Sequence, residues 1–328
     1  MNIVFVYRKK IQGRYSLENV FNSLIPYLKK KHNIRIYYTR GRKFLFQDIF
    51  HLRSLKADIY HIVGDINYFS IFLPKKKTIL TIPDIGHYIY GLKTIKKFLY
   101  KWLWIKLPHY CTQHIVTISN FSKSKIFEII NKNNCKIDVI PCCYREDLKF
   151  FRKKFDKSNI RILFVGTAYN KNFISLIKAV KFTNWKITII GKISISDKIL
   201  LDEYKINYKN LINVNFKKII KAYKTNDILC FLSLYEGFGL PVIEANVSGV
   251  PVIASNIEPI KTVAGKAAYL VSPRNIKDIK KSILKIINNE KFRNKLVLNG
   301  LENVKKYHPS VIAKRYCQLY NFFYNYDQ

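Results

Sequence analysis

The strongest constraint on the fold is an alternation of short apolar, β-branched runs with longer amphipathic ones. Asn2–Tyr7 is apolar enough to form a buried strand, and Ser16 then precedes apolar residues at helical spacing. The alternation breaks at a charged stretch, Lys149–Asn159, and restarts at Ile160. Because strands that alternate with helices form parallel, doubly wound sheets, the sequence predicts two α/β halves joined near residue 150.

Each half supplies several such elements. The expected strands are Asn2–Tyr7, Ile34–Tyr38, Ile59–Val63, Thr78–Ile82, His114–Ile118, Ile137–Ile140, Ile160–Val165, Trp185–Ile190, Leu211–Phe216, Ile228–Leu232 and Val250–Ala254. The expected helices are Leu17–Leu28, Ile95–Leu107, Phe121–Asn131, Phe173–Val180, Leu200–Lys205, Ile219–Tyr223, Asn275–Asn288, Glu290–Lys306 and Ser310–Tyr324. The G-x-G-x-x-G pattern of dinucleotide-binding enzymes is absent from both halves.

Composition narrows the class of partner. A chain of 328 residues is long enough for two domains, and 48% hydrophobic residues with 15% aromatics exclude a disordered protein. The formal net charge of +37 indicates an anionic partner, which could be nucleic acid, an anionic membrane surface or a phosphorylated substrate. Compositional drift explains the charge equally well, since lysine, isoleucine, asparagine and tyrosine are abundant together.

Cysteines and apolar runs indicate the compartment. The six cysteines form no C-x-x-C pair, as expected of free thiols in a reducing cytosol. Met1–Tyr7 is too short for the core of a signal peptide, and no run approaches the roughly 18 apolar residues of a membrane-spanning helix. We therefore expect a cytoplasmic protein, either soluble or attached to the inner face of a membrane.

The stretch Ser233–Ile253 carries the clearest chemistry. It holds two carboxylates, Glu236 and Glu244, around a glycine-punctuated turn and a proline that can open a helix. A helix N-terminus offers unpaired N–H donors to phosphate, and carboxylates accept hydrogen bonds from vicinal hydroxyls of a sugar or ribose. The alternative for Glu244 is an ordinary residue in the first turn of a helix, facing the helix dipole.

The ordered string is more specific than the spacing. Ser233-x-x-Glu236-Gly237-Phe238-Gly239-Leu240-Pro241-x-x-Glu244-Ala245, followed by Gly249-x-Pro251-Val252-Ile253, resembles the signature of retaining family-4 glycosyltransferases with the GT-B fold. Further segments are similar to landmarks of that family: Phe164–Ala179, Val116–Ser122, Val139–Pro141 and Val263–Ala268.

The resemblance implies an architecture. It predicts two Rossmann-like domains that face each other across a cleft, with the active site in that cleft. Residues 1–150 would bind the acceptor, and residues 151–309 would bind a nucleotide-sugar donor. Residues 310–328 would form a helix that packs back on the first domain, and the domains would close over the donor to exclude water.

The resemblance also implies residue roles. Glu236 would contact the hydroxyls of the donor sugar, and Glu244 would hold the ribose. Lys171 would neutralise the diphosphate leaving group. The remaining donor-binding residues would be Gly166, Thr167, Asn172, Gly237, Phe238, Gly239 and Leu240, those from 237 to 240 through their backbone N–H groups.

The sequence departs from the family pattern where the other half would contribute. Thr167 stands where the family often has arginine, so the phosphate cation would be Lys171 alone or Arg14 of the loosely matching loop around Gly13. A proline precedes Asp84, where the family usually has histidine. Asp84 remains the second catalytic candidate, with His87 beside it, both facing the acceptor.

The family implies a retaining, metal-independent hexosyltransferase. Its co-substrate would be a nucleotide-diphosphate sugar, with no other cofactor and no metal ion, and its acceptor a glycan or lipid-linked glycan in cell-surface polysaccharide or glycoconjugate synthesis. The sequence has no Asp-x-Asp, which metal-dependent transferases of the other major fold use. Alternatives are a GT-B-like sugar-nucleotide enzyme or an inactive scaffold.

The positive net charge raises two further possible partners, a nucleic acid and an anionic membrane surface. A nucleic acid is disfavoured, because no recognised binding motif is present and Ser233–Ile253 would stay unexplained. An anionic membrane surface could bind the basic N-terminal domain through Tyr88–Tyr110, which mixes lysines with large aromatics as interfacial helices do. An ordinary core helix with a solvated basic face has the same composition.

Overall fold

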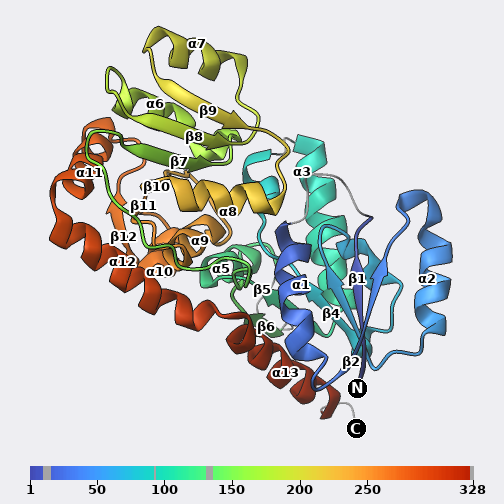
Figure 1. The fold of residues 1–328 in the computed structure, drawn as a ribbon. Coiled ribbons are helices and arrows are strands. Elements are labelled where there is room, and N and C mark those ends of the chain that lie inside the picture. The colour runs from blue at the N-terminus through green and yellow to red at the C-terminus, as the bar shows by residue number, and fades with distance from the viewer. Residues whose placement is uncertain (10–15, 92–93, 131–135, 326–328) are drawn as a thin grey trace. The chain divides into compact units, whose positions relative to one another are not determined.

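The computed structural model describes residues 1–9, 16–91, 94–130 and 136–325. They form two compact units (Figure 1). Unit 1 comprises Met1–Cys143 and His308–Gln328, and unit 2 comprises Tyr144–Tyr307. The boundaries therefore lie at 143/144 and 307/308, beside the 150/151 and 309/310 expected from the sequence.

Unit 1 is built on a parallel sheet of six strands in the order β2-β1-β3-β4-β5-β6. Its strands are β1 (Asn2–Tyr7), β2 (Asn33–Tyr38), β3 (Ile59–Val63), β4 (Thr78–Thr81), β5 (His114–Thr117) and β6 (Lys136–Val139). Its helical segments are α1 (Ser16–Leu28), η1 (Arg42–Phe44), α2 (Leu45–Ser54), η2 (Asn67–Ile71), η3 (Lys75–Lys77), η4 (His87–Gly91), α3 (Thr94–Tyr100), η5 (Lys101–Lys106), α4 (Leu107–Cys111), α5 (Asn120–Phe127) and α13 (Pro309–Asn325).

Successive strand residues point to opposite faces of this sheet, so each strand feeds two cores. On one face, Tyr60 and Ile62 of β3 join a cluster with residues of α2, η2, η5 and α5. On the other face lie α1 and α13, side by side in Figure 1. The fully buried His61 of β3 joins them there, because its Nδ1 lies 2.7 Å from the hydroxyl of Tyr320 and its ring packs on Phe21.

Unit 2 repeats the architecture with a parallel sheet in the order β12-β11-β10-β7-β8-β9. Its strands are β7 (Arg161–Val165), β8 (Lys186–Ile190), β9 (Asn207–Leu211), β10 (Ile228–Phe231), β11 (Val252–Ser255) and β12 (Ala268–Val271). Its helical segments are η7 (Tyr169–Lys171), α6 (Phe173–Val180), α7 (Ile195–Glu203), α8 (Phe216–Thr225), α9 (Leu240–Val247), α10 (Ile260–Ala264), η8 (Gly265–Ala267), α11 (Ile276–Asn288), α12 (Glu290–Val304) and η9 (Lys305–Tyr307). One core cluster of this unit joins β7 and β8 to α6, α11 and α12.

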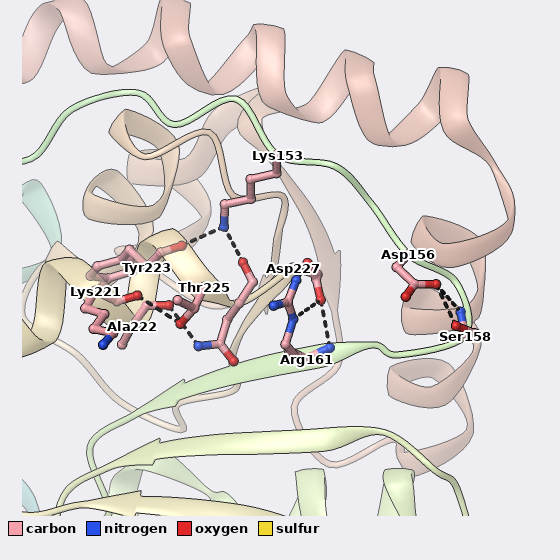
Figure 2. Close-up of polar contacts among 10 residues, drawn as sticks. Lys153, Asp156, Ser158, Arg161, Lys221, Ala222, Tyr223, Thr225 and Asp227 are labelled. Carbon is pink, nitrogen blue, oxygen red and sulfur yellow. Dashed lines mark hydrogen bonds and ion pairs between the residues drawn. The ribbon is translucent and has the colours of Figure 1, made fainter.

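The charged stretch before β7 is anchored to unit 2 (Figure 2). The ammonium of Lys153 donates to the backbone oxygens of Tyr223, at 2.6 Å, and of Asn226. Burial lowers the pKa of Lys153 to about 8. Arg161 at the start of β7 forms a two-pronged ion pair with the buried Asp227, at 3.0 Å. Buried polar contacts therefore hold the charged stretch at which the sequence predicts that the two halves are joined.

Several predicted elements are placed wrongly at the edges of the sheets. The expected strand Leu211–Phe216 is instead β9, Asn207–Leu211, and Asn215 caps α8. The edge strand β12 and the helix α2 were not predicted. The expected helix Ile95–Leu107 is interrupted, because α3 passes into the π-helical segment η5 before α4 begins.

Across the described residues, no helix combines the length and apolarity that crossing a membrane requires.

Candidate active site

Two loops of unit 2 bring most of the predicted donor residues together. One follows β7 and the other follows β10, and the carboxyl ends of neighbouring parallel strands meet at one edge of a sheet. Leu234 N donates to Asn170 O at 2.7 Å, and the side chain of Asn170 donates back to Tyr235 O at 3.0 Å. These bonds hold the loop that carries Lys171 against the loop that carries Glu236.

Lys171 and Glu236 form an ion pair at this edge. Lys171 Nζ lies 2.5 Å from Glu236 Oε1, and the hydroxyl of Ser233 donates to the same oxygen at 2.6 Å. Both side chains are largely buried, so solvent screens the pair less than it would a surface pair. Gly166, with φ of +88°, permits this arrangement, because a Cβ there would come within 2.9 Å of Lys171 Cε.

Asn172 fixes the turn that presents Lys171. Its backbone is left-handed, with φ of +60°, and its side chain is buried. The side-chain amide donates to Leu232 O at 3.1 Å and to Pro273 O at 2.6 Å, while its oxygen accepts from the Ser175 hydroxyl at 2.8 Å. Asn172 is thus a structural clamp between β7, β10 and β12.

The glycine turn after Glu236 leads into α9. Gly239 has φ of +122°, which favours glycine, and α9 begins at Leu240 with Pro241 in its first turn. The first N–H groups of a helix lack intrahelical acceptors and carry partial positive charge. The side chain of Phe238 is buried, and its ring packs edge-on against Tyr307 with the ring centres 5.6 Å apart.

Glu244 has a different partner from Glu236. Its Oε2 accepts a hydrogen bond from the buried hydroxyl of Tyr223 on α8 at 2.7 Å. Burial raises the pKa of Glu244, whereas the Tyr223 hydrogen bond and the charge of Arg145 act to lower it. Arg145 in turn stacks on Phe216, 3.7 Å from the ring centre. Two carboxylates in one helix–loop segment therefore occupy distinct environments.

Thr167 does not reach toward Lys171. Its hydroxyl donates to Lys192 O at 2.7 Å, which ties the end of β7 to the loop after β8. Thr167 lines a cavity of about 590 Å³ together with Asn172, Leu234 and the exposed Arg274. Sequence reasoning did not identify Arg274 as a cation near this loop.

The two candidates from unit 1, Asp84 and His87, line one cavity of about 200 Å³. Asp84 Oδ1 accepts from Gly86 N at 2.8 Å, which orders the turn after β4. The other lining residues are Arg8, Leu17, Gly64, Asp65, Asn67, Ile82, Pro83, Ile85, Tyr100 and Ile105. Gly13 and Arg14, the remaining predicted contacts, lie outside the described residues.

Arg8 and Asp65 are functional candidates that sequence reasoning missed. Arg8 directly follows β1 and pairs with Glu18 at 2.6 Å, and Asp65 follows the end of β3 by two residues. The signal was available, because polar residues just after buried parallel strands meet at the carboxyl edge of the sheet. Among the described residues, no group of three or more His, Cys, Asp or Glu side chains is arranged to hold a metal ion.

Comparisons with known proteins identify similar glycosyltransferases. The family model described as glycosyl transferases group 1 matches residues 145–303. The capsular polysaccharide biosynthesis glycosyltransferase CapM of Staphylococcus aureus is 28% identical over 267 residues, or 71% of this chain and 68% of CapM. The O-antigen chain mannosyltransferase B of Escherichia coli is 27% identical over 284 residues, or 78% of this chain and 72% of that protein.

Solved structures share the fold. Sucrose-phosphate synthase from Thermosynechococcus elongatus superposes with a TM-score of 0.77 at 14% identity, covering 99% of both chains. The Anabaena protein HepE, solved in complex with UDP and glucose, gives 0.76 at 12% identity, covering 97% of this chain and 99% of HepE. The chain therefore has the GT-B fold and is a glycosyltransferase, and its residues 145–303 are similar to the glycosyl transferases group 1 family.

Proposed function

We propose that this glycosyltransferase moves a hexosyl residue from a nucleotide-diphosphate sugar to a glycan or lipid-linked glycan, in synthesis of a cell-surface polysaccharide or glycoconjugate. The observation that carries the donor assignment is the Lys171–Glu236 pair at the carboxyl edge of the unit 2 sheet. Ligands of open α/β sheets bind at that edge. The names of the relatives, for capsular polysaccharide and O-antigen synthesis, support the class of product.

Lys171 is suited to a departing diphosphate. Among the described residues its ammonium has Glu236 as hydrogen-bond partner, and an ammonium carries three donors. A bound diphosphate would accept from the others, so that Lys171 would bridge the leaving group and Glu236. Positive charge fixed beside an oxygen that becomes more negative lowers the barrier to transfer.

Glu236 would then act on the sugar itself. Its second carboxylate oxygen, Oε2, would accept from the hydroxyls of the donor sugar and hold the anomeric carbon toward the acceptor. Glu244 would accept from the ribose hydroxyls, and backbone N–H groups of residues 237–240 would donate to the diphosphate. We propose that transfer proceeds with retention of anomeric configuration and that Lys171, in place of a metal ion, supplies the charge opposite the diphosphate.

On the acceptor side, the cavity of unit 1 offers hydrogen-bonding groups of both signs. Asp84 and Asp65 would accept from sugar hydroxyls, and Arg8 would donate to sugar oxygens or to a phosphate. We propose that Asp84 accepts the proton of the attacking hydroxyl, with His87 positioning that hydroxyl. We also propose that the enzyme works as a peripheral protein on an anionic membrane.

A donor screen followed by a transfer assay tests the proposal. A panel of UDP-, GDP-, ADP- and TDP-sugars should contain one class that raises the midpoint temperature of thermal unfolding. At a ligand concentration of a hundred times Kd, binding adds about 2.7 kcal/mol to the free energy of unfolding. The same sugar should be transferred in excess EDTA at an unchanged rate, and NMR of the product should show the anomeric configuration of the donor. The proposal fails if no nucleotide sugar shifts the midpoint, or if EDTA stops transfer.

A further inference from the structure

Unit 1 exposes large apolar side chains on two segments that lie far apart in the sequence. On α2, Phe46 and Phe50 are 77% and 80% exposed. On the α3–η5 segment, Phe98 is 62% exposed and Trp102 is 43% exposed, with Leu99 and Leu103 between them also exposed. Sequence reasoning singled out the second segment and missed the first.

Both segments cover the same face of the unit 1 sheet. Ile49 and Leu52 of α2 and Ile105 of η5 point inward and belong to one core cluster, so both segments pack on the same core and leave their opposite sides outside it. One contact joins the start of α2 to η5, and a second ties α2 to the end of η2. The guanidinium of Arg42, just before α2, lies 5.4 Å from the ring centre of Trp104, and Phe46 packs edge-on against Phe72 after η2. We call Phe46, Phe50, Phe98, Leu99, Trp102 and Leu103 the aromatic face.

The charge around the aromatic face has one sign along α3 and η5. The sequence contains no acidic residue between Asp84 and Glu128. Lys96 is exposed, and Lys106 Nζ lies 4.6 Å from the ring centre of Trp102. Lysines interleaved with exposed aromatic rings match the boundary of a bilayer, where rings enter the acyl region and ammonium groups stay among anionic headgroups. Water alone would leave this much apolar surface uncompensated.

The inward side of the same segment forms part of the unit 1 cavity. Tyr100 and Ile105 line that cavity beside Asp84 and His87. Tyr100 also stacks nearly parallel on the half-buried Trp104 of η5, with ring centres 5.5 Å apart, so the segment that carries the exposed rings also packs along the cavity wall. An α-helix is about 10 Å across. A bilayer in contact with the aromatic face would therefore lie roughly one helix diameter from the cavity.

We propose that the aromatic face docks on an anionic phospholipid bilayer and that the cavity behind it takes the polar end of an acceptor whose apolar end stays in that bilayer. The docking half stands on the surface of unit 1 alone. The acceptor half rests on the proposed function. The lipid surface would then act as a second substrate-binding element, raising the local concentration of acceptor beside Asp84.

Vesicle sedimentation tests docking without any sugar donor. The full chain should bind vesicles of phosphatidylcholine with about a quarter phosphatidylglycerol, and bind pure phosphatidylcholine much more weakly, since each lysine near an anionic surface contributes about fivefold in partitioning. The double variants Phe46→Ser/Phe50→Ser and Phe98→Ser/Trp102→Ser should each lose at least about tenfold, because burying one phenylalanine in an apolar phase is worth roughly that factor or more.

A matched control removes equally exposed apolar side chains from unit 2. Phe182 and Leu298 are 73% and 66% exposed, and Phe182→Ser/Leu298→Ser should bind vesicles as the wild type does. Lys96→Gln/Lys101→Gln should reduce binding to phosphatidylglycerol vesicles without touching the apolar surface. Docking is refuted if the wild type ignores phosphatidylglycerol vesicles, if the control loses as much as the aromatic variants, or if the aromatic variants change only self-association or nucleic-acid binding.

Kinetics separate the acceptor half from the proposed function. With the donor fixed, Phe98→Ser/Trp102→Ser should raise KM for a long-chain lipid-linked acceptor in anionic vesicles about tenfold or more, and leave kcat/KM for a water-soluble analogue unchanged. An equal loss with both acceptors would overturn the acceptor half. Absence of transfer to either acceptor by the wild type would refute the proposed function, while the vesicle data would still decide docking.

Discussion

The two units carry the same six-stranded parallel sheet but build their sites differently. In unit 2, Lys171 and Glu236 come from two loops that reciprocal hydrogen bonds of Asn170 lock together. In unit 1, Arg8, Asp65 and Asp84 come from separate strand ends and line one cavity. The family model matches residues 145–303, all of them in unit 2.

The proposed roles of the two sites would account for this difference. A nucleotide diphosphate presents the same charges whatever sugar it carries, so a fixed loop pair with one ammonium suits every donor. Acceptors differ in shape and linkage, and a cavity assembled from separate strand ends can change one residue at a time. We therefore expect changes in unit 2 to affect every transfer, and changes in unit 1 to depend on the acceptor.

The largest expected effect is in unit 2. Lys171→Ala removes the charge beside the leaving diphosphate and should lower kcat by about 10²–10³, as loss of one transition-state donor does in other enzymes. The loss should be the same for every acceptor, measured by steady-state kinetics with two acceptors. Lys178→Ala, an exposed lysine on α6, is the control and should keep full activity.

In unit 1, Asp84→Asn should act on the acceptor alone. Removing the proposed base should cost about 10² in kcat/KM for the acceptor. The thermal shift produced by the donor should stay as in the wild type, because Asp84 lies in the other unit. Glu128→Gln, which removes one partner of an exposed ion pair, serves as the control. A smaller donor-induced thermal shift in Asp84→Asn would contradict the assignment of the donor to unit 2 and the acceptor to unit 1.

The units should also differ in their response to acid. Burial lowers the pKa of His61 to about 3, below the ordinary 6.5, so its neutral form stabilises the folded state of unit 1. That stability is complete above pH 6.5 and is lost as the pH falls toward 3, by about 1.4 kcal/mol per pH unit. Between pH 6.5 and 5 the loss is about 2 kcal/mol.

Amide hydrogen exchange measures this difference in pH-dependent stability separately for the strands of each unit. Protection of β3 and β4 in unit 1 should fall between pH 6.5 and 5 after correction for the intrinsic exchange rate, while protection of β7 and β8 changes less. His61→Gln should flatten the pH dependence in β3 and β4. Equal slopes in the wild type and His61→Gln would show that His61 does not stay neutral in the folded state.

The smallest expected effect concerns Thr167. Thr167→Arg places a second cation beside the loop of Lys171, and should tighten binding of the nucleotide diphosphate by about twofold to thirtyfold. Hydrogen bonds to a charged group contribute about 1.5–3 kcal/mol, and the lost Thr167–Lys192 hydrogen bond offsets about 1 kcal/mol. Calorimetric titration measures the gain, with Thr183→Arg at the far end of α6 as a control for net charge. Unchanged affinity would place Thr167 outside reach of the diphosphate.

Sequence reasoning succeeded where local pattern and burial agree. Strands such as β1 and β10 are buried on both faces and read as continuous apolar runs, and the glycines at 166 and 239 mark turns with positive φ. The motif around Glu236 could be recognised from the sequence because its residues lie in one short loop. Its contact with Lys171, 65 residues away, could be expected from the family resemblance and not from spacing.

The edges of the sheets, and sites formed by residues that are distant in the sequence, were harder to predict. β9 is polar and half-exposed, so its residues Asn207–Leu211 look like a loop, whereas the apolar Ile212 beyond it looks like a strand. α2 exposes Phe46 and Phe50, which hides its amphipathic pattern. The unit 1 cavity joins residues up to 97 positions apart, from Arg8 to Ile105, that no local pattern connects.

Glu236 is the most direct test of the central claim, that the carboxyl edge of unit 2 positions the donor sugar for transfer. Sugar transfer and nucleotide-sugar binding would be measured on the same samples of wild type, Glu236→Ala and the exposed-surface control Glu203→Gln. We predict that Glu236→Ala binds the donor within about tenfold of the wild type and transfers at least about 10²-fold more slowly, with the control unchanged. Undiminished transfer by Glu236→Ala would contradict the account.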